Sequence, residues 1–82
     1  MIDDKSVRWR CRRGMKELDV LLGRFLERGY AQLDERERGV FVRLLDQKDP
    51  DLMDWLTGRD RPADLAFDAL IGRMQSFISS SA

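Results

Sequence analysis

Side chains capable of specific binding gather between residues 8 and 19. Four arginines and an indole come first, a lone glycine follows, and two carboxylates come after it: Arg8, Trp9, Arg10, Arg12, Arg13, Gly14, Glu17 and Asp19. A planar guanidinium binds carboxylates and carbonyls through paired hydrogen bonds, and a residue without a side chain lets another backbone approach closely. A solubility patch would not need a tryptophan, whereas protein interfaces are often anchored by one. Together these residue types predict a docking site for another macromolecule.

The same segment also has a purely structural interpretation. Acids suit the first turn of a helix, where unpaired N–H groups and the positive end of the helix dipole favour negative charge. If Gly14 ends one helix and is the N-cap of the next, Glu17 occupies the third helical position, from which its carboxylate can reach back to the capping residue's N–H. The arginines would then form a solvated face. The residues alone leave both interpretations open.

Composition restricts the class of protein. A chain of 82 residues with 43% hydrophobic content makes a single domain over residues 1–82, which can bury only about 60% of the surface its unfolded form exposes. Such a domain has little room for a deep pocket, which argues against an enzyme. Histidine is absent, which removes Ser-His and Cys-His nucleophile pairs, the usual zinc ligand sets and a histidyl flavin on this chain. We therefore expect no catalytic residue and no metal site.

Charge and cysteine content bear on partner and compartment. The formal charge is zero, yet residues 1–16 hold six basic groups against two acids, and this polarity favours an oriented encounter with a partner of complementary charge. A dedicated nucleic-acid-binding domain is usually basic throughout. The single cysteine, Cys11, suits a reducing compartment, the polar and acidic first residues predict that there is no secretory signal, and no apolar run reaches roughly 20 residues. These features predict a cytoplasmic protein that binds neither membrane nor nucleic acid.

Periodicity and capping signals predict an all-α fold, a compact bundle of about five short helices. The first runs from a cap at Asp3 or Asp4 to about residue 12, with Val7 and Cys11 inward, and Cys11 is expected to be a small buried hydrophobe. The second, residues 15–30, carries the clearest apolar stripe, ends at Gly29 and Tyr30, and contains Gly23, which would mark close approach of another helix at a cost of about 1 kcal/mol relative to alanine.

Three further helices are expected in the second half of the chain. Asp34 and Glu37 form a capping box for a helix to about residue 46, and Asp49 caps a fourth helix that begins at Pro50 and ends before Gly58. Pro62 opens a fifth over residues 63–77, and residues 79–82 are expected to be a frayed tail. Its apolar side would consist of Leu65, Ala66, Ala69, Leu70, Met74, Phe77 and Ile78. The acids Asp49, Asp51 and Asp54 fit either a second partner-facing patch or ordinary capping and solvation.

A family resemblance rests on a signature segment and on matches at later positions. The segment comprises Trp9, Cys11, Arg12, Arg13, Gly14, Met15, Glu17, Leu18 and Asp19, and the matches continue through Phe41, Leu44, Leu45, Asp49, Pro50, Asp51, Leu52, Trp55, Leu56, Pro62, Ala63 and Asp64. The chain resembles the small flavinylation, or FAD assembly, factors of succinate dehydrogenase (SdhE-type), whose core motif is R-G-x-x-E. The likeness spans most of the chain, and the downstream D-P-D-L-x-x-W-L makes it far more specific than the short motif alone.

The resemblance implies a function that the residues alone do not. Factors of this family are not enzymes; they bind the flavoprotein subunit of succinate dehydrogenase, and in bacteria of fumarate reductase, and promote covalent attachment of FAD to a histidine of that subunit. Carried over to this chain, the partner-binding residues are Arg13, Gly14 and Glu17, flanked by Trp9, Arg12, Met15 and Asp19. Arg13 would pair with a carboxylate or carbonyls, and Glu17 would accept from a donor of the partner or fix the Arg13 fork. The factor itself would hold no cofactor stably and would be a monomer when free.

Two other classes of function stay open on the sequence. An N-terminal basic arm with Trp9 interleaved could bind nucleic acid, in which case binding would weaken steeply with salt. A general regulatory or antitoxin-like helical protein is the other alternative. Co-purification distinguishes the three, because it would yield a flavoprotein, a nucleic acid or an unrelated toxin.

Overall fold

The computed structural model describes residues 4–79, with Asp4 described by its backbone alone. Its elements in chain order are α1 (Asp4–Arg10), α2 (Lys16–Arg28), a short 3-10 helix η1 (Tyr30–Gln32), α3 (Glu35–Leu44), α4 (Asp49–Leu56) and α5 (Leu65–Ile78). No strand occurs in this part of the chain. The predicted all-α bundle of five helices is confirmed.

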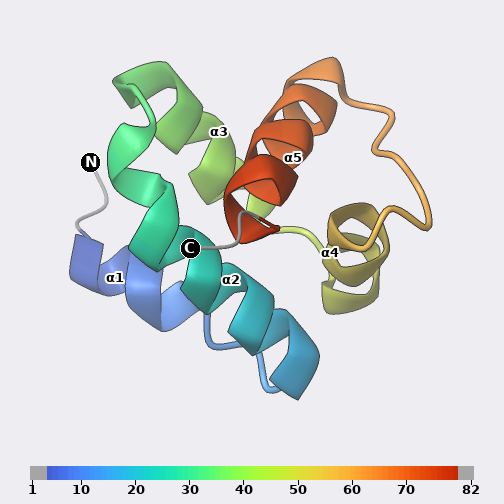
Figure 1. Cartoon of the computed structure of the whole chain (residues 1–82), viewed down its shortest axis with the longest axis horizontal. Helices are drawn as coiled ribbons and strands as arrows, with labels where there is room; N and C mark the ends of the chain where they lie inside the picture. The colour runs from blue at the N-terminus through green and yellow to red at the C-terminus, as the bar shows by residue number, and fades with distance from the viewer. Residues whose placement is uncertain (1–3, 80–82) are drawn as a thin grey trace.

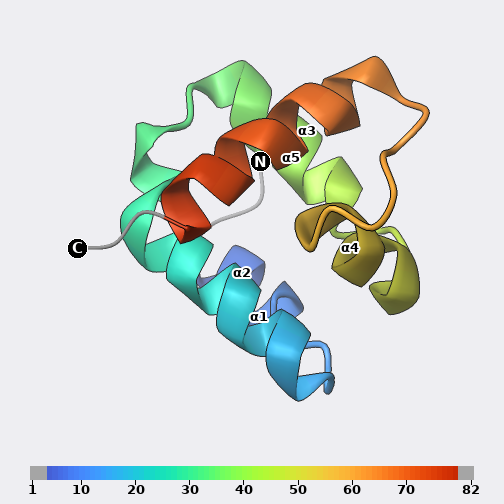
Figure 2. The same cartoon turned by 45° about the vertical axis from the view of Figure 1, so that its right-hand side comes forward.

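Helices α2 and α5 form the centre of the bundle. Helix α5 packs against α2, α3 and α4, with α3 on one side and α4 on the other, while α1 lies beside α2 (Figures 1 and 2). The core between them is aromatic at one end, where the ring of Phe41 lies 5.2 Å from that of Phe25 and 5.6 Å from that of Tyr30. Helix α1 reaches the core through Val7, and Cys11 is buried just beyond its end, which confirms the predicted inward pair.

Two helix boundaries follow the local chemistry predicted for them. Asp34 accepts a hydrogen bond from the Glu37 N–H at 2.8 Å, and the Glu37 carboxylate accepts one from the Asp34 N–H at 3.0 Å, so the capping box is complete. Helix α2 ends at Gly29 as predicted. A Cβ at Gly29 would lie 2.4 Å from the Phe77 ring and 2.8 Å from the Phe25 ring. Only glycine therefore allows the end of α2 to approach α5 this closely.

Other predicted starts were wrong by one or two residues. The N-cap of α2 is Met15 rather than Gly14, and the N-cap of α4 is Lys48, so that Asp49 lies within the first turn. Helix α5 begins at Leu65, because the Asp64 carboxylate accepts from the next free N–H groups, those of residues 66 and 67, at 2.8 and 3.2 Å. Asp4 is already helical in α1, and the alternative cap, Asp3, lies outside the described residues.

The predicted apolar side of α5 was also partly wrong. Leu65 is 83% exposed, and Ala66 and Ala69 are exposed as well. The buried stripe consists of Phe67, Leu70, Ile71 and Met74, of which Phe67 and Ile71 had not been assigned to the core. Residues 80–82 of the tail expected to be frayed lie outside the described part of the chain. Helix α5 is the longest element at 14 residues, and no helix between residues 4 and 79 is long and apolar enough to cross a membrane.

Candidate docking site at the junction of α1 and α2

The backbone turns sharply between α1 and α2. Gly14 adopts φ +89°, a conformation that side chains disfavour, so glycine is required by the turn itself. Glu17 is the second helical residue of α2, and the predicted reach of its carboxylate back to an N-cap N–H does not occur. Instead the Asp19 carboxylate accepts a hydrogen bond from the Arg13 N–H at 2.6 Å. Asp19 thus fixes the turn in the way that had been predicted for Glu17.

The guanidinium of Arg13 turns into the protein and is bound on every side by its own chain. Its Nε donates to Asp49 Oδ1 at 2.7 Å, Nη1 donates to the carbonyls of Leu45 at 2.6 Å and Arg10 at 3.2 Å, and Nη2 donates to the carbonyl of Gln47 at 2.8 Å. The side chain is only 16% exposed. A carboxylate and carbonyls had been predicted as its partners, but on another protein. Within this chain, Arg13 ties the junction to the connection between α3 and α4.

A second ion pair runs parallel to the first. Arg10 pairs with Asp46, and both this pair and Arg13–Asp49 span 36 residues. The Asp46 side chain is 67% exposed, so this pair contributes little to stability by comparison. Neither pair had been predicted from the sequence. The available signal was the matching spacing, since the two arginines and the two aspartates are each three residues apart.

The seven predicted partner-binding residues therefore divide into two groups. Arg13 and Asp19 are bound to their own chain, and Met15 is half-buried against the core. The other four have exposed positions on the surface: Trp9, Arg12, Gly14 and Glu17. Trp9 is 72% exposed, and among the described large apolar side chains only Leu65 is more exposed. Four of the seven residues are thus available to a partner, and the other three stabilise the junction through contacts within this chain.

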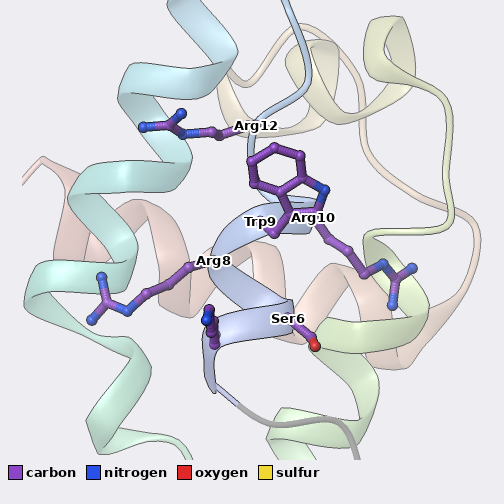
Figure 3. A pocket seen from close by; sticks show the side chains of 6 residues that line it. Ser6, Arg8, Trp9, Arg10 and Arg12 are labelled. Carbon is purple, nitrogen blue, oxygen red and sulfur yellow. The ribbon is translucent and has the colours of Figure 1, made fainter.

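The surface around Trp9 is strongly basic. A depression is lined by Trp9 together with Lys5, Ser6, Arg8, Arg10 and Arg12. Figure 3 shows that Arg8, from α1, and Arg12, from the segment just after α1, both extend toward α2, while Arg10 extends to the opposite side, where it pairs with Asp46. The exposed indole consequently lies between cations, an arrangement suited to a partner surface that offers both apolar contact and carboxylates.

Comparison with known proteins identifies the family. The family model described as "Flavinator of succinate dehydrogenase" matches residues 5–78, which include every helix from α2 to α5 and all but the first residue of α1. The chain belongs to this family.

Two relatives support the assignment over nearly the whole length. The chain is 47% identical to the FAD assembly factor SdhE of Coxiella burnetii over 75 residues, which cover 92% of each protein. It is 50% identical to the FAD assembly factor SdhE of Xylella fastidiosa over 71 residues, 87% of this chain and 73% of that one. The resemblance stated from the sequence is confirmed. Both relatives are named as assembly factors, which agrees with the prediction that this flavinator-family chain is not an enzyme.

In this flavinator-family chain, the three residues of the signature motif do not all face the same way. Of R-G-x-x-E, Arg13 points inward, while Gly14 and Glu17 are exposed. Glu17 does not fix the Arg13 fork, as one interpretation had it, because Asp49 does so. That hydrogen bond also bears on the acidic patch considered at Asp49, Asp51 and Asp54. Because Asp49 is bound to Arg13 within this chain, it is not available as part of a partner-facing acidic patch.

The Cys11 thiol, buried near the junction, is expected to be unreactive. Burial raises its pKa to about 11, and the nearby cations of Arg13, Arg10 and Arg8 lower it by less than burial raises it. The thiol is therefore protonated at neutral pH, and a protonated thiol is a poor nucleophile. Cys11 is 4% exposed and belongs to the core cluster, as predicted.

Proposed function

We propose that this protein is an FAD assembly factor that binds the flavoprotein subunit of succinate dehydrogenase and promotes covalent attachment of FAD to a histidine of that subunit. The main support for this proposal is the match to the flavinator family over residues 5–78. A protein named as an FAD assembly factor is also 47% identical to this chain over 92% of both chains. The related flavoprotein subunit of fumarate reductase is a second client of the same surface. The proposed place of action is the cytoplasm.

The contact surface that we propose consists of Trp9, Arg12, Gly14 and Glu17. Their exposure supports this choice, as does the absence of any hydrogen bond or ion pair from the Arg12 and Glu17 side chains to residues that the structure describes. Trp9 supplies apolar contact area, and Gly14 lets the partner's backbone approach the turn. Glu17 accepts hydrogen bonds from donors of the partner. Arg13, Met15 and Asp19 act indirectly, by holding this surface in shape.

The proposed mechanism is selective binding. A protein that binds one conformation of its partner more tightly than the others shifts the partner toward that conformation by its difference in affinity. The factor would favour the flavoprotein conformation in which FAD and the acceptor histidine lie in position to react, and the bond would form within the flavoprotein. The factor then needs no cofactor of its own, and we propose that it holds none stably and is a monomer when free.

Covalent flavin on the partner is the direct measurement. After denaturing electrophoresis, in-gel fluorescence of the flavoprotein subunit is compared between cells with and without this protein. We expect a strong loss of covalent flavin in the deletion strain and recovery on complementation. An unchanged signal in the deletion strain under all growth conditions would contradict the proposed function.

Complementation with surface variants tests the contact residues. Glu17→Gln and Trp9→Ala should fold normally, because both side chains are exposed, yet restore less covalent flavin. Glu35→Gln is the matched control for Glu17, since Glu35 is also an exposed glutamate in the first turn of a helix. Gly14→Arg is less suitable, because φ +89° at this position would strain any side chain. Full activity of both test variants would exclude this surface from the contact.

A further inference from the structure

A groove extends from the junction along α2. It lies between the basic side of α1 and the exposed face of α2, and its lining includes Arg8, Arg12, Gly14, Val20, Gly23 and Leu26. Val20 is 46% exposed and, with Trp9 and Leu65, is one of three large hydrophobic side chains that are exposed among the described residues. Apolar surface is therefore accessible along the groove well beyond the R-G-x-x-E motif.

Gly23 keeps this groove open, and no internal contact requires it to be glycine. The prediction that Gly23 marks close approach of another helix is wrong, because a Cβ at this position would meet no atom within 4 Å. Glycine in the middle of a helix is less favourable than almost any other residue. Gly23 lines the groove. Because it has no side chain, the groove is not blocked along the surface of α2.

Within the described part of the chain, no carboxylate pairs with the cations beside the groove. Arg8, Arg12 and Lys16 make no hydrogen bond or ion pair with residues 5–79, whereas Arg10 and Arg13 are both bound to aspartates. The one carboxylate in the lining, that of Asp19, already accepts the Arg13 N–H. The groove thus combines accessible apolar surface with three positive charges along its border that no residue from 5 to 79 pairs.

We propose that this groove receives an extended acidic segment of the flavoprotein subunit, which runs from Gly14 along α2 to Gly23 and Leu26. Carboxylates of that segment pair with Arg8, Arg12 and Lys16, and an apolar side chain of the segment rests on Val20 and Leu26. Charge complementarity selects this occupant, because three cations without a partner among residues 5–79 favour an acidic segment and the open glycine favours an extended chain. The inference rests on the proposed function and adds a second contact region to the exposed residues of the junction.

Filling the groove is the sharpest test, since it separates binding from folding. Gly23→Leu replaces a poor helix former by a good one at an open position, so the variant should unfold at the same or a higher temperature. Its Kd for purified flavoprotein subunit that has not yet been flavinylated should nevertheless rise on the order of tenfold. Gly39→Leu is the matched control, because Gly39 is an exposed glycine inside α3 with nothing within 4 Å of a built Cβ. An unchanged Kd for Gly23→Leu, with wild type binding normally, would overturn the proposal that the groove binds the flavoprotein but would leave the proposed function intact.

Charge reversal tests the border of the groove. Arg8→Glu should raise Kd on the order of tenfold at low salt, and the difference from wild type should shrink as salt is added. Arg24→Glu changes the same charge on an exposed residue of α2 outside the groove lining and should leave Kd near that of wild type. Equal effects of the two variants would indicate general charge attraction and would overturn the specific role of Arg8.

Photo-crosslinking identifies the occupant. With p-benzoylphenylalanine in place of Val20, the expected product is a crosslink to one segment of the flavoprotein subunit that is rich in Asp or Glu. The same probe at Gly39 should give no such product. A crosslink from position 20 only to a second copy of this chain, to nucleic acid, or to a basic segment of the flavoprotein would overturn the proposal.

Discussion

Two connections in this bundle use the same residue types to different effect. The junction between α1 and α2 and the long connection between α4 and α5 each contain a glycine at positive φ, +89° at Gly14 and +80° at Gly58. Each also contains an arginine bound to an aspartate, Arg13 to Asp49 and Arg61 to Asp68. They lie at separate edges of the molecule (Figure 1).

The difference lies in burial and in how far the arginine reaches. Arg13 is 16% exposed and binds a carboxylate and three carbonyls, and its partners at residues 45–49 are distant in the sequence. Arg61 is 81% exposed and binds both oxygens of an aspartate seven residues away, at 3.1 and 2.7 Å. An ideal fork-to-carboxylate geometry on the surface is thus a weaker constraint than a shared, half-buried network. The comparison predicts that substitutions at the junction between α1 and α2 lower the stability of the whole fold. Substitutions in the connection between α4 and α5 should have only local effects.

Loss of the Arg13 side chain should have the largest effect. Arg13→Ala leaves Asp49 and the carbonyls of Leu45 and Gln47 without their donor, which should cost about 3 to 4 kcal/mol of unfolding free energy. That corresponds to a drop on the order of 15 °C in Tm for a domain of this size. Arg12→Ala is the neighbouring control and should leave Tm unchanged, because Arg12 is exposed. Equal Tm values for the two variants, measured by circular dichroism, would remove the distinction between the two connections.

Alkaline pH should weaken the junction through Cys11. Because burial raises the pKa of the folded-state thiol to about 11 from 9.0, the stabilisation from the neutral thiol is fully present below pH 9 and is lost as pH rises through 11. The loss should reach roughly 2 to 3 kcal/mol. Denaturant unfolding between pH 8 and 11 measures it, and Cys11→Ala should show a smaller alkaline decline than wild type. Parallel declines in the two proteins would mean that Cys11 is not the titrating group.

Neutralising the acid of the Arg13 network should have an intermediate effect. Asp49→Asn keeps an oxygen acceptor for the Arg13 Nε but removes the charge, which should cost about 1.5 kcal/mol. Asp51→Asn is the control on the same turn of α4, and Asp51 is exposed. Chemical denaturation of the two variants gives the comparison. A larger loss for Asp51→Asn would contradict the assignment of Asp49 as the carboxylate that holds Arg13.

Loss of the Arg61 side chain should have the smallest effect. Arg61→Ala should leave Tm within experimental error of wild type, because the Arg61 side chain is 81% exposed and its pair with Asp68 is therefore made largely in water. A local change is still expected: the hydrogen bond from Arg61 holds the pKa of Asp68 below its usual range, so the variant should raise that pKa in an NMR titration. A fall in Tm as large as that of Arg13→Ala would show that the exposed connection also supports the fold.

Local chemistry predicted the helices far better than the contacts between them. The Asp34 and Glu37 capping box and the stop at Gly29 were correct because their signals lie within a few residues of the feature they control. The start of α5 was misplaced because Pro62 and Asp64 both signal a helix start, and the structure uses the aspartate. The same error obscured the stripe from Phe67 to Met74, since Leu65 and the alanines offered a competing apolar face.

The candidate site could be predicted in composition but not in orientation. The segment from Trp9 to Asp19 was recognised, and the exposure of Trp9 and Gly14 agrees with a docking surface. That Arg13 turns inward could not be foreseen from local periodicity, because its partner Asp49 is 36 residues away. Gly23 was misjudged for a related reason: a glycine inside a helix can accompany either a tight contact or an open groove, and only the surrounding atoms distinguish them.

The guanidinium of Arg13 resembles a disulfide in what it accomplishes. It joins two positions far apart along the chain, and by doing so it limits how far the first two helices can swing from the rest of the bundle. Unlike a disulfide, it needs no oxidant to form and no reductant can open it. A protein with one buried thiol thereby obtains a crosslink whose strength is indifferent to redox conditions, and lysine, with a single terminal nitrogen, could not take its place.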